Sequence, residues 1–182
     1  MTRFGYVMTT YFAALGFTVL GVVSPGPKFI WNASGSVPVG LYILHPADKL
    51  HIGDLLAVRP PKSLIAFLDQ RRYLPSGVPM LKYVAALPGQ NVCHLGRKVS
   101  VDGKAVAEAL DRDRLGRPLP VWHGCRVIAA GEVFLLNARW DSLDGRYFGP
   151  LPITAVMGRA DAWSDDRGNQ PLQPVSSKAC SR

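Results

Sequence analysis

Two serines flank a glycine at Ser34-Gly35-Ser36, shortly before Pro38. A nucleophilic serine often lies on a turn where glycine allows close approach of the substrate, and a proline stiffens the chain beyond it. An ordinary loop has the same composition, so these residues indicate a candidate nucleophile and do not establish one. Such a serine also needs a neighbouring base to take its proton.

Histidine is the usual base for a serine nucleophile, but none of the four histidines lies in a recognisable catalytic motif. They are His45, His51, His94 and His123. A buried lysine can do the same work when desolvation lowers its pKa. Lys82 begins the apolar segment Lys82 to Leu87, which ends in a Pro-Gly turn. Lys82 is therefore the outstanding candidate among the lysines.

A third block, from Asn137 to Pro150, is dense in polar groups and directly follows an apolar run. Asp144 and Arg146 could pair there, and Ser142 could hydrogen-bond a neighbouring lysine. On these residues alone, a solvated loop is an equally good interpretation.

The three blocks, in this order, resemble the type I signal peptidases. The shared features are Ser-Gly-Ser near a proline, a lysine followed by valine and Leu-Pro-Gly, and Ser-x-Asp-x-Arg-Tyr-x-Gly. The segment Ser36 to Tyr42 is most similar to the conjugative-transfer signal peptidases of the TraF type. General signal peptidases carry Ser-Met-x-Pro and Gly-Asp-Asn-Arg, where this chain has Ser36-Val37-Pro38 and Leu136 to Arg139.

The resemblance assigns a role to each block. It implies that Ser36 is the nucleophile of a serine-lysine dyad and that Lys82 is its general base. Ser34 is similar to a hydroxyl that forms the oxyanion hole together with the backbone N–H of Ser36. In the third block, Ser142 matches a residue that orients the lysine, and a supporting ion pair is implied between Asp144 and Arg146.

The function implied by the resemblance is that of a membrane-anchored serine endopeptidase. It would mature an exported pilin precursor for conjugative plasmid transfer, at the bacterial inner membrane and with its catalytic domain facing the periplasm. Transfer-apparatus proteins are further expected partners. Whether the pilin is hydrolysed or cyclised stays open. The alternatives are a general type I signal peptidase for secreted proteins and a non-catalytic component of the transfer apparatus.

The N-terminal segment is expected to anchor the chain. The apolar run Phe4 to Val23 is long enough to span a bilayer, since about twenty residues rising about 1.5 Å each match the hydrocarbon thickness. The following Ser24 to Pro27 ends any helix and lacks the small-x-small pattern of a cleavage site. We expect residues 1–28 to be a transmembrane anchor, 29–164 the catalytic domain and 165–182 a polar, flexible tail.

Short apolar runs between turn residues predict many β-strands. They are Phe29 to Trp31, Leu41 to Leu44, Leu55 to Val58, Lys82 to Val84, Val99 to Val101 and Val133 to Leu136. Asp102-Gly103 predicts a two-residue hairpin, and Ser63 to Leu74 predicts a helix capped by Ser63 and closed by Pro75. The expected fold class is mainly β: a signal-peptidase-like β domain with one N-terminal transmembrane helix and a short helical insert.

The formal net charge of +8 permits attraction to nucleic acid or to anionic lipid. Lysines and arginines are scattered along the chain, so we expect inner-membrane lipid as a partner and no nucleic acid.

The three cysteines show no C-x-x-C pair and no histidines at metal-ligand spacing, so no metal and no other cofactor is expected. In an oxidising location, Cys93 and Cys125 are expected to form a disulfide and Cys180 to stay unpaired.

Overall fold

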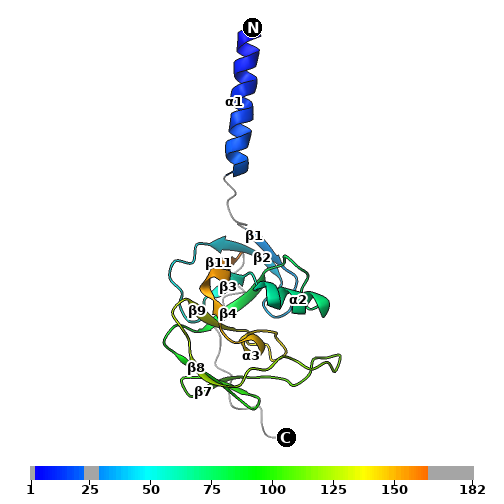
Figure 1. Cartoon of the computed structure of the whole chain (residues 1–182), viewed down its shortest axis with the longest axis vertical. Helices are drawn as coiled ribbons and strands as arrows, with labels where there is room; N and C mark the ends of the chain where they lie inside the picture. The colour runs from blue at the N-terminus through cyan, green and yellow to red at the C-terminus, as the bar shows by residue number, and fades with distance from the viewer. Residues whose placement is uncertain (1–2, 23–28, 164–182) are drawn as a thin grey trace.

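The computed structural model describes residues 3–22 and 29–163, and shows a domain built mainly from β-strands (Figure 1). Its larger sheet has seven strands, each antiparallel to its neighbours. In spatial order they are β1 (Phe29–Asn32), β2 (Gly40–His45), β11 (Val156–Ala162), β3 (Leu55–Val58), β4 (Met80–Ala86), β9 (Glu132–Leu136) and β10 (Leu151–Pro152). The predicted mainly β fold class is confirmed.

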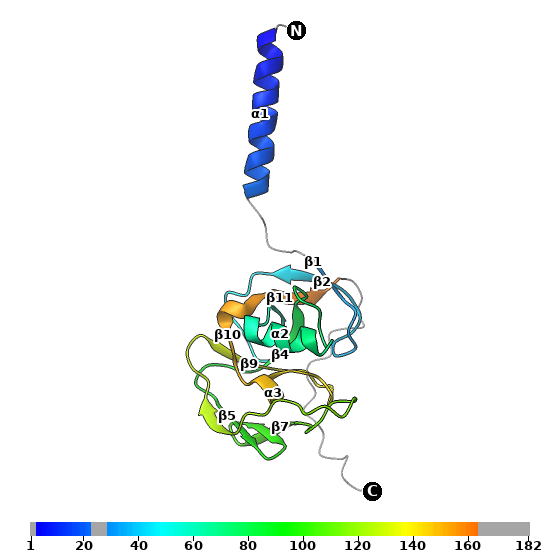
Figure 2. The same cartoon turned by 45° about the vertical axis from the view of Figure 1, so that its right-hand side comes forward.

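A smaller antiparallel sheet lies at the end of the domain away from β1 and β2 (Figures 1 and 2). Its four strands are β7 (Lys104–Glu108), β6 (Lys98–Val101), β5 (Asn91–Leu95) and β8 (Gly124–Val127). The β6–β7 hairpin turns at Asp102 (φ 48°) and Gly103 (φ 79°), as the Asp-Gly pair predicts. The remaining elements are α1 (Arg3–Val22), α2 (Lys62–Gln70), α3 (Gly145–Phe148) and the short 3₁₀ helix η1 (Ile153–Ala155).

Strand β4 lies between β3 and β9 inside the larger sheet, and side chains from both of its faces belong to buried apolar clusters. Because side chains alternate along a strand, Met80, Lys82 and Val84 point to one face. Met80 and Val84 belong to a buried apolar cluster that also contains Leu64 and Leu68 of α2. The fold therefore places an amine on the apolar face of a central strand.

The predicted helix begins and ends elsewhere than expected. Helix α2 starts at Lys62, so Ser63 lies inside its first turn, and Pro61 at the N-cap offers no side-chain hydrogen bond. It ends at Gln70, not Leu74. Arg72 adopts a left-handed conformation (φ 57°), and the N–H of Tyr73 bonds to the Leu68 carbonyl at 2.8 Å. This Schellman closure, rather than Pro75, terminates the helix.

Six elements had no predicted counterpart: β5, β8, β10, β11, α3 and η1. Strand β11 matters most, because it joins β2 to β3 across the larger sheet. At Gly158 of β11 an added Cβ would lie 2.6 Å from the His45 carbonyl oxygen, so a side chain would collide with β2. Glycine is thus needed for the close approach of these strands.

Helix α1 coincides with the expected anchor and stands apart from the sheets (Figures 1 and 2). Across the described residues, no helix meets the combined length and apolarity that crossing a membrane requires, and the transmembrane prediction is not confirmed. The expected polar tail, 165–182, and with it Cys180, lies outside the described residues, as do 1–2 and 23–28.

Candidate active site

The loop between β1 and β2 carries Ser36 and is held by Asn32, the last residue of β1. The buried Asn32 Nδ2 donates to the carbonyl oxygens of Ser34, Val37 and Pro38 at 2.9–3.0 Å. Its Oδ1 accepts from the backbone N–H of Ser34 at 3.1 Å and from Ser34 Oγ at 2.9 Å. One amide therefore fixes both sides of the turn, a role that was not predicted although asparagine is common in turns.

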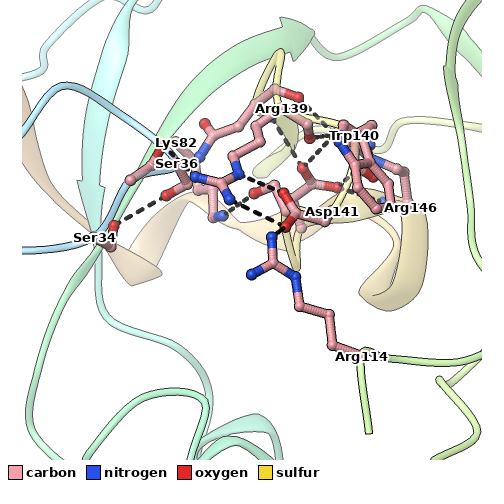
Figure 3. A network of polar contacts seen from close by, with 12 residues as sticks. Ser34, Ser36, Lys82, Arg114, Arg139, Trp140, Asp141 and Arg146 are labelled. Carbon is pink, nitrogen blue, oxygen red and sulfur yellow. Dashed lines mark hydrogen bonds and ion pairs between the residues drawn. The ribbon is translucent and has the colours of Figure 1, made fainter. Parts of the chain in front are cut away.

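The two serines of the motif lie beside each other. Ser34 Oγ and Ser36 Oγ are 3.1 Å apart, within hydrogen-bond distance (Figure 3). Ser36 is half-buried, and the next residue, Val37, is buried in the core with Tyr42 and Leu81. Burial of Val37 thus anchors the turn and leaves the Ser36 hydroxyl at the edge of a cavity.

Lys82 lies in that same cavity, which has a volume of about 690 Å³. Its side chain is almost wholly buried, and Nζ donates to Ser142 Oγ at 2.8 Å. Burial lowers the pKa of Lys82 to about 8, while the Asp144 carboxylate opposes this shift and the Arg146 guanidinium adds to it. In the described part of the chain, Ser36 Oγ bonds to Ser34 and not to Lys82. Such contacts commonly tighten only when substrate binds.

The third block places Asp144 and Arg146 behind the lysine, where both are buried. Asp144 Oδ1 accepts from Arg146 Nε and Oδ2 from Arg146 Nη2, both at 3.0 Å. Arg146 also donates to the carbonyls of Asn137, Arg139 and Trp140. The pair therefore ties the whole turn after β9 together and holds Ser142 opposite Lys82.

Glycine at position 145 is required by packing. An added Cβ would lie 2.6 Å from Phe134 Cε2 and 2.7 Å from the Leu135 carbonyl oxygen. Trp122 Nε1 donates to the Gly145 carbonyl at 2.9 Å. Helix α3 can therefore lie directly against β9, which brings the third block to the end of the central strands.

Arginine and aspartate side chains on the cavity wall were not predicted as site residues. Asp141 pairs with both Arg139 and Arg114, and all three residues line the cavity (Figure 3). Arg139 and Asp141 stand within the third block, so their charge was visible in the sequence. Arg114 comes from the loop between β7 and β8, and nothing local connects it to the site.

The remaining predicted residues lie elsewhere. Cys93 and Cys125 are register partners on β5 and β8 and form a disulfide in the smaller sheet, the pair expected from the sequence. Neither lines the cavity that contains Ser36. Over residues 3–22 and 29–163, no group of three or more His, Cys, Asp or Glu side chains is arranged to hold a metal ion.

Several known proteins are similar to this chain. The family described as signal peptidase, peptidase S26, matches residues 1–164. The conjugal transfer protein TraF of Agrobacterium fabrum is 33% identical over 157 residues, which cover 80% of this chain and 85% of that protein. The probable conjugal transfer protein TraF of Sinorhizobium fredii is 36% identical over 140 residues, covering 71% and 73%. A signal peptidase I structure from Enterococcus faecalis V583 covers 62% of this chain and 97% of its own, with a TM-score of 0.39 and 19% identity.

Proposed function

Because the chain belongs to the signal peptidase family, peptidase S26, we propose that this serine peptidase matures an exported pilin-type precursor for conjugative plasmid transfer. In this proposal Ser36 is the nucleophile and Lys82 the general base. The oxyanion hole consists of Ser34 Oγ and the Ser36 N–H. Ser142, Asp144 and Arg146 position the lysine.

The observation that carries the proposal is the burial of the Lys82 amine in the cavity that also contains Ser36. An ordinary lysine near pKa 10.5 is almost wholly protonated at neutral pH and cannot accept a proton. With a pKa of about 8, roughly a tenth of the amine is neutral at pH 7. A buried, partly neutral amine in the cavity that also contains Ser36 is what a serine-lysine dyad requires.

The first half of the reaction follows from these positions. Lys82 Nζ takes the proton of the Ser36 hydroxyl as Oγ attacks the carbonyl carbon of the scissile peptide bond. The negative charge on the carbonyl oxygen is stabilised by the Ser36 N–H and by the Ser34 hydroxyl, whose hydrogen turns from Asn32 Oδ1 to the oxyanion. When the tetrahedral intermediate collapses, the Lys82 ammonium returns its proton to the leaving amine, and an ester on Ser36 remains.

The second half releases the ester. Lys82 removes a proton from the attacking group, which adds to the ester carbonyl, and then returns the proton to Ser36 Oγ. Water as the attacking group gives a linear carboxylic acid, whereas the amino terminus of the same substrate gives a cyclic amide. The sequence leaves both outcomes open for this chain, so the product itself must be identified.

The proposed setting is the inner membrane, with the β domain on the periplasmic side. Relatives carry conjugal transfer names, which supports a transfer substrate rather than general secretion. Along the described side chains of α1, large apolar residues are exposed, as lipid contact would need. They are Phe4, Tyr6, Val7, Met8, Tyr11, Phe12, Leu15 and Phe17.

Mass spectrometry of the pilin precursor encoded nearest this gene tests the proposal. The precursor is co-expressed with the wild type, with Ser36→Ala or with Lys82→Ala. We expect processing with the wild type only, and a cyclic product would be lighter than the linear one by one water. Near-normal processing by either variant would contradict the catalytic assignment. Intact pilin beside cleaved secretory precursors would instead favour a general signal peptidase.

A further inference from the structure

The side chain of Arg139 reaches the peptide unit directly before the proposed nucleophile. Its Nη1 donates a 3.2 Å hydrogen bond to the Gly35 carbonyl oxygen, across 104 positions of sequence. That carbonyl and the Ser36 N–H belong to one planar peptide unit. A hydrogen bond that fixes the carbonyl therefore also fixes the direction of the Ser36 N–H.

Arg139 is itself held in place by Asp141. Asp141 Oδ1 accepts from Arg139 Nε, and Oδ2 accepts from Arg139 Nη2 at 3.3 Å. Asp141 pairs in addition with Arg114, so the carboxylate is fixed from two sides (Figure 3). This arrangement leaves Nη1 of Arg139 free to donate to Gly35.

Gly35 has no side chain, and this leaves the space that the Arg139 guanidinium occupies. An added Cβ would lie 2.6 Å from Arg139 Nη1, and the next nearest atom is Arg139 Cζ at 3.8 Å. Gly35 is not among the glycines with positive φ, so the backbone itself would accept alanine. Among the described residues, apart from the adjacent Ser34 and Ser36, only the side chain of Arg139 lies within 4 Å of such a methyl group.

We propose that Arg139 is a positioning residue for the oxyanion hole. By holding and polarising the Gly35 carbonyl, it directs the Ser36 N–H at the oxyanion and strengthens that N–H as a donor. The inference rests on the proposed function, because it needs Ser36 to form the tetrahedral intermediate. The competing explanation is a partly exposed ion pair without catalytic effect, which is common for such pairs.

Steady-state kinetics of the full chain in detergent test the inference. The substrate is a quenched fluorescent peptide that spans the processing site mapped in the pilin precursor. Loss of one whole oxyanion donor costs roughly 100- to 1000-fold in kcat, so we expect Arg139→Ala to lower kcat by about 10- to 100-fold with KM within about twofold. Arg126→Ala, which removes another partly exposed arginine paired with Glu132, should keep wild-type kcat.

A transition-state analogue distinguishes a positioning role of Arg139 in the oxyanion hole from a general role in maintaining the shape of the cavity. A peptide boronic acid forms a tetrahedral adduct with a serine hydroxyl and so places a negative oxygen in the hole. Its affinity should fall in Arg139→Ala by about the same factor as kcat/KM, whereas the affinity of the same peptide without boron should not change. Equal losses for both peptides would show that Arg139 only maintains the shape of the cavity, and would overturn the inference.

A double-mutant cycle with Gly35→Ala gives the decisive comparison. In the wild-type background the new methyl group displaces Arg139, so Gly35→Ala should reduce kcat as Arg139→Ala does. In the Arg139→Ala background the space is free, and Gly35→Ala should cost nothing further. Additive losses would overturn the inference.

The activity of Ser36→Ala separates failure of the proposed function from failure of the inference. If Ser36→Ala were as active as the wild type, the proposed function would fail. If Ser36→Ala is inactive while Arg139→Ala keeps full kcat, the inference alone is wrong.

Discussion

Lys82 Nζ donates a 2.8 Å hydrogen bond to Ser142 Oγ, although 60 positions separate the two residues. A neutral amine has two N–H bonds and one lone pair. Once Ser142 accepts one N–H, rotation about the last bond of the lysine is restricted, and the lone pair can be directed into the cavity. Ser142 is buried as well, so its position is set by the turn after β9 rather than by solvent.

Ser142→Ala should therefore lower kcat while leaving KM nearly unchanged. The lysine keeps its burial but loses its orientation, which we expect to cost roughly 10- to 100-fold in kcat, in the range of a positioned acid-base group. Ser142→Thr keeps a hydroxyl and should retain more activity than alanine. Cleavage of the fluorescent peptide measures both variants, and equal rates for Ser142→Ala and the wild type would exclude this role.

The rate of peptide cleavage should rise with pH and level off above about 8. Only the neutral form of Lys82 can take the serine proton, and the pKa of the amine is lowered to about 8 by burial. A pH–rate profile of kcat/KM for the full chain gives this value directly. Lys82→Arg should be inactive at every accessible pH, because guanidinium does not release its proton. Activity in the arginine variant would mean that another group is the base.

Asp144→Ala should destabilise the domain strongly. Asp144 and Arg146 expose only 2% each, and the arginine would be left buried without a counter-charge. Breaking a buried pair in this way costs about 3–5 kcal/mol. Asp161→Ala removes an exposed carboxylate that faces His45 and should change stability little. Chemical denaturation of the purified chain compares the two, and similar unfolding midpoints for both variants would show that the Asp144 pair adds no stability.

Cys93→Ser with Cys125→Ser should reduce stability without removing activity. The disulfide closes a loop with a sequence separation of 32 residues, and chain-entropy reasoning gives about 3–4 kcal/mol for its loss. Neither cysteine lines the cavity that contains Ser36, so kcat should stay close to that of the wild type. Chemical denaturation of the wild type, with and without reductant, and of the double variant measures this loss. An unfolding midpoint that does not change when the disulfide is absent would contradict the prediction.

Local sequence patterns predicted those elements whose burial is continuous along the chain. Strands β3 and β9 are nearly fully buried and appear as short apolar runs, so the pattern and the structure agree. Strand β11 has polar residues such as Arg159 and Asp161 and was missed, because pairing with two neighbouring strands, rather than its own composition, keeps it extended. The end of α2 depends on one left-handed residue, Arg72, which no residue-type pattern indicates.

The residues of the site also fall into those that the sequence predicted and those that it did not. The order of the three blocks pointed to Ser36, Lys82 and Ser142, and the structure brings all three to one cavity. The contribution of Arg139 could not be predicted, because its partner Gly35 lies 104 positions away and the hydrogen bond uses a backbone carbonyl. Contacts of this kind depend on chain folding and leave no signal in residue spacing.

Replacement of the buried lysine by an apolar residue should stabilise the protein at neutral pH. The pKa of Lys82 is about 8 in the folded chain, against an ordinary value of 10.5. Between these values the unfolded chain binds more protons, so the free energy of unfolding rises with pH from about 8 to 10.5. Below pH 8 the folded state carries the full penalty, about 3 kcal/mol for a shift of this size.

Lys82→Met removes this penalty, because methionine has similar length and no charge. At pH 7 we expect the variant to unfold at higher denaturant concentration than the wild type, and the two curves to converge as pH approaches 10.5. Lys98→Met, which changes an exposed lysine on β6, should show no such pH-dependent gap. A constant gap between Lys82→Met and the wild type over this pH range would show that the lysine is not held in an unfavourable environment. Convergence would show instead that the environment needed for catalysis lowers the stability of the fold.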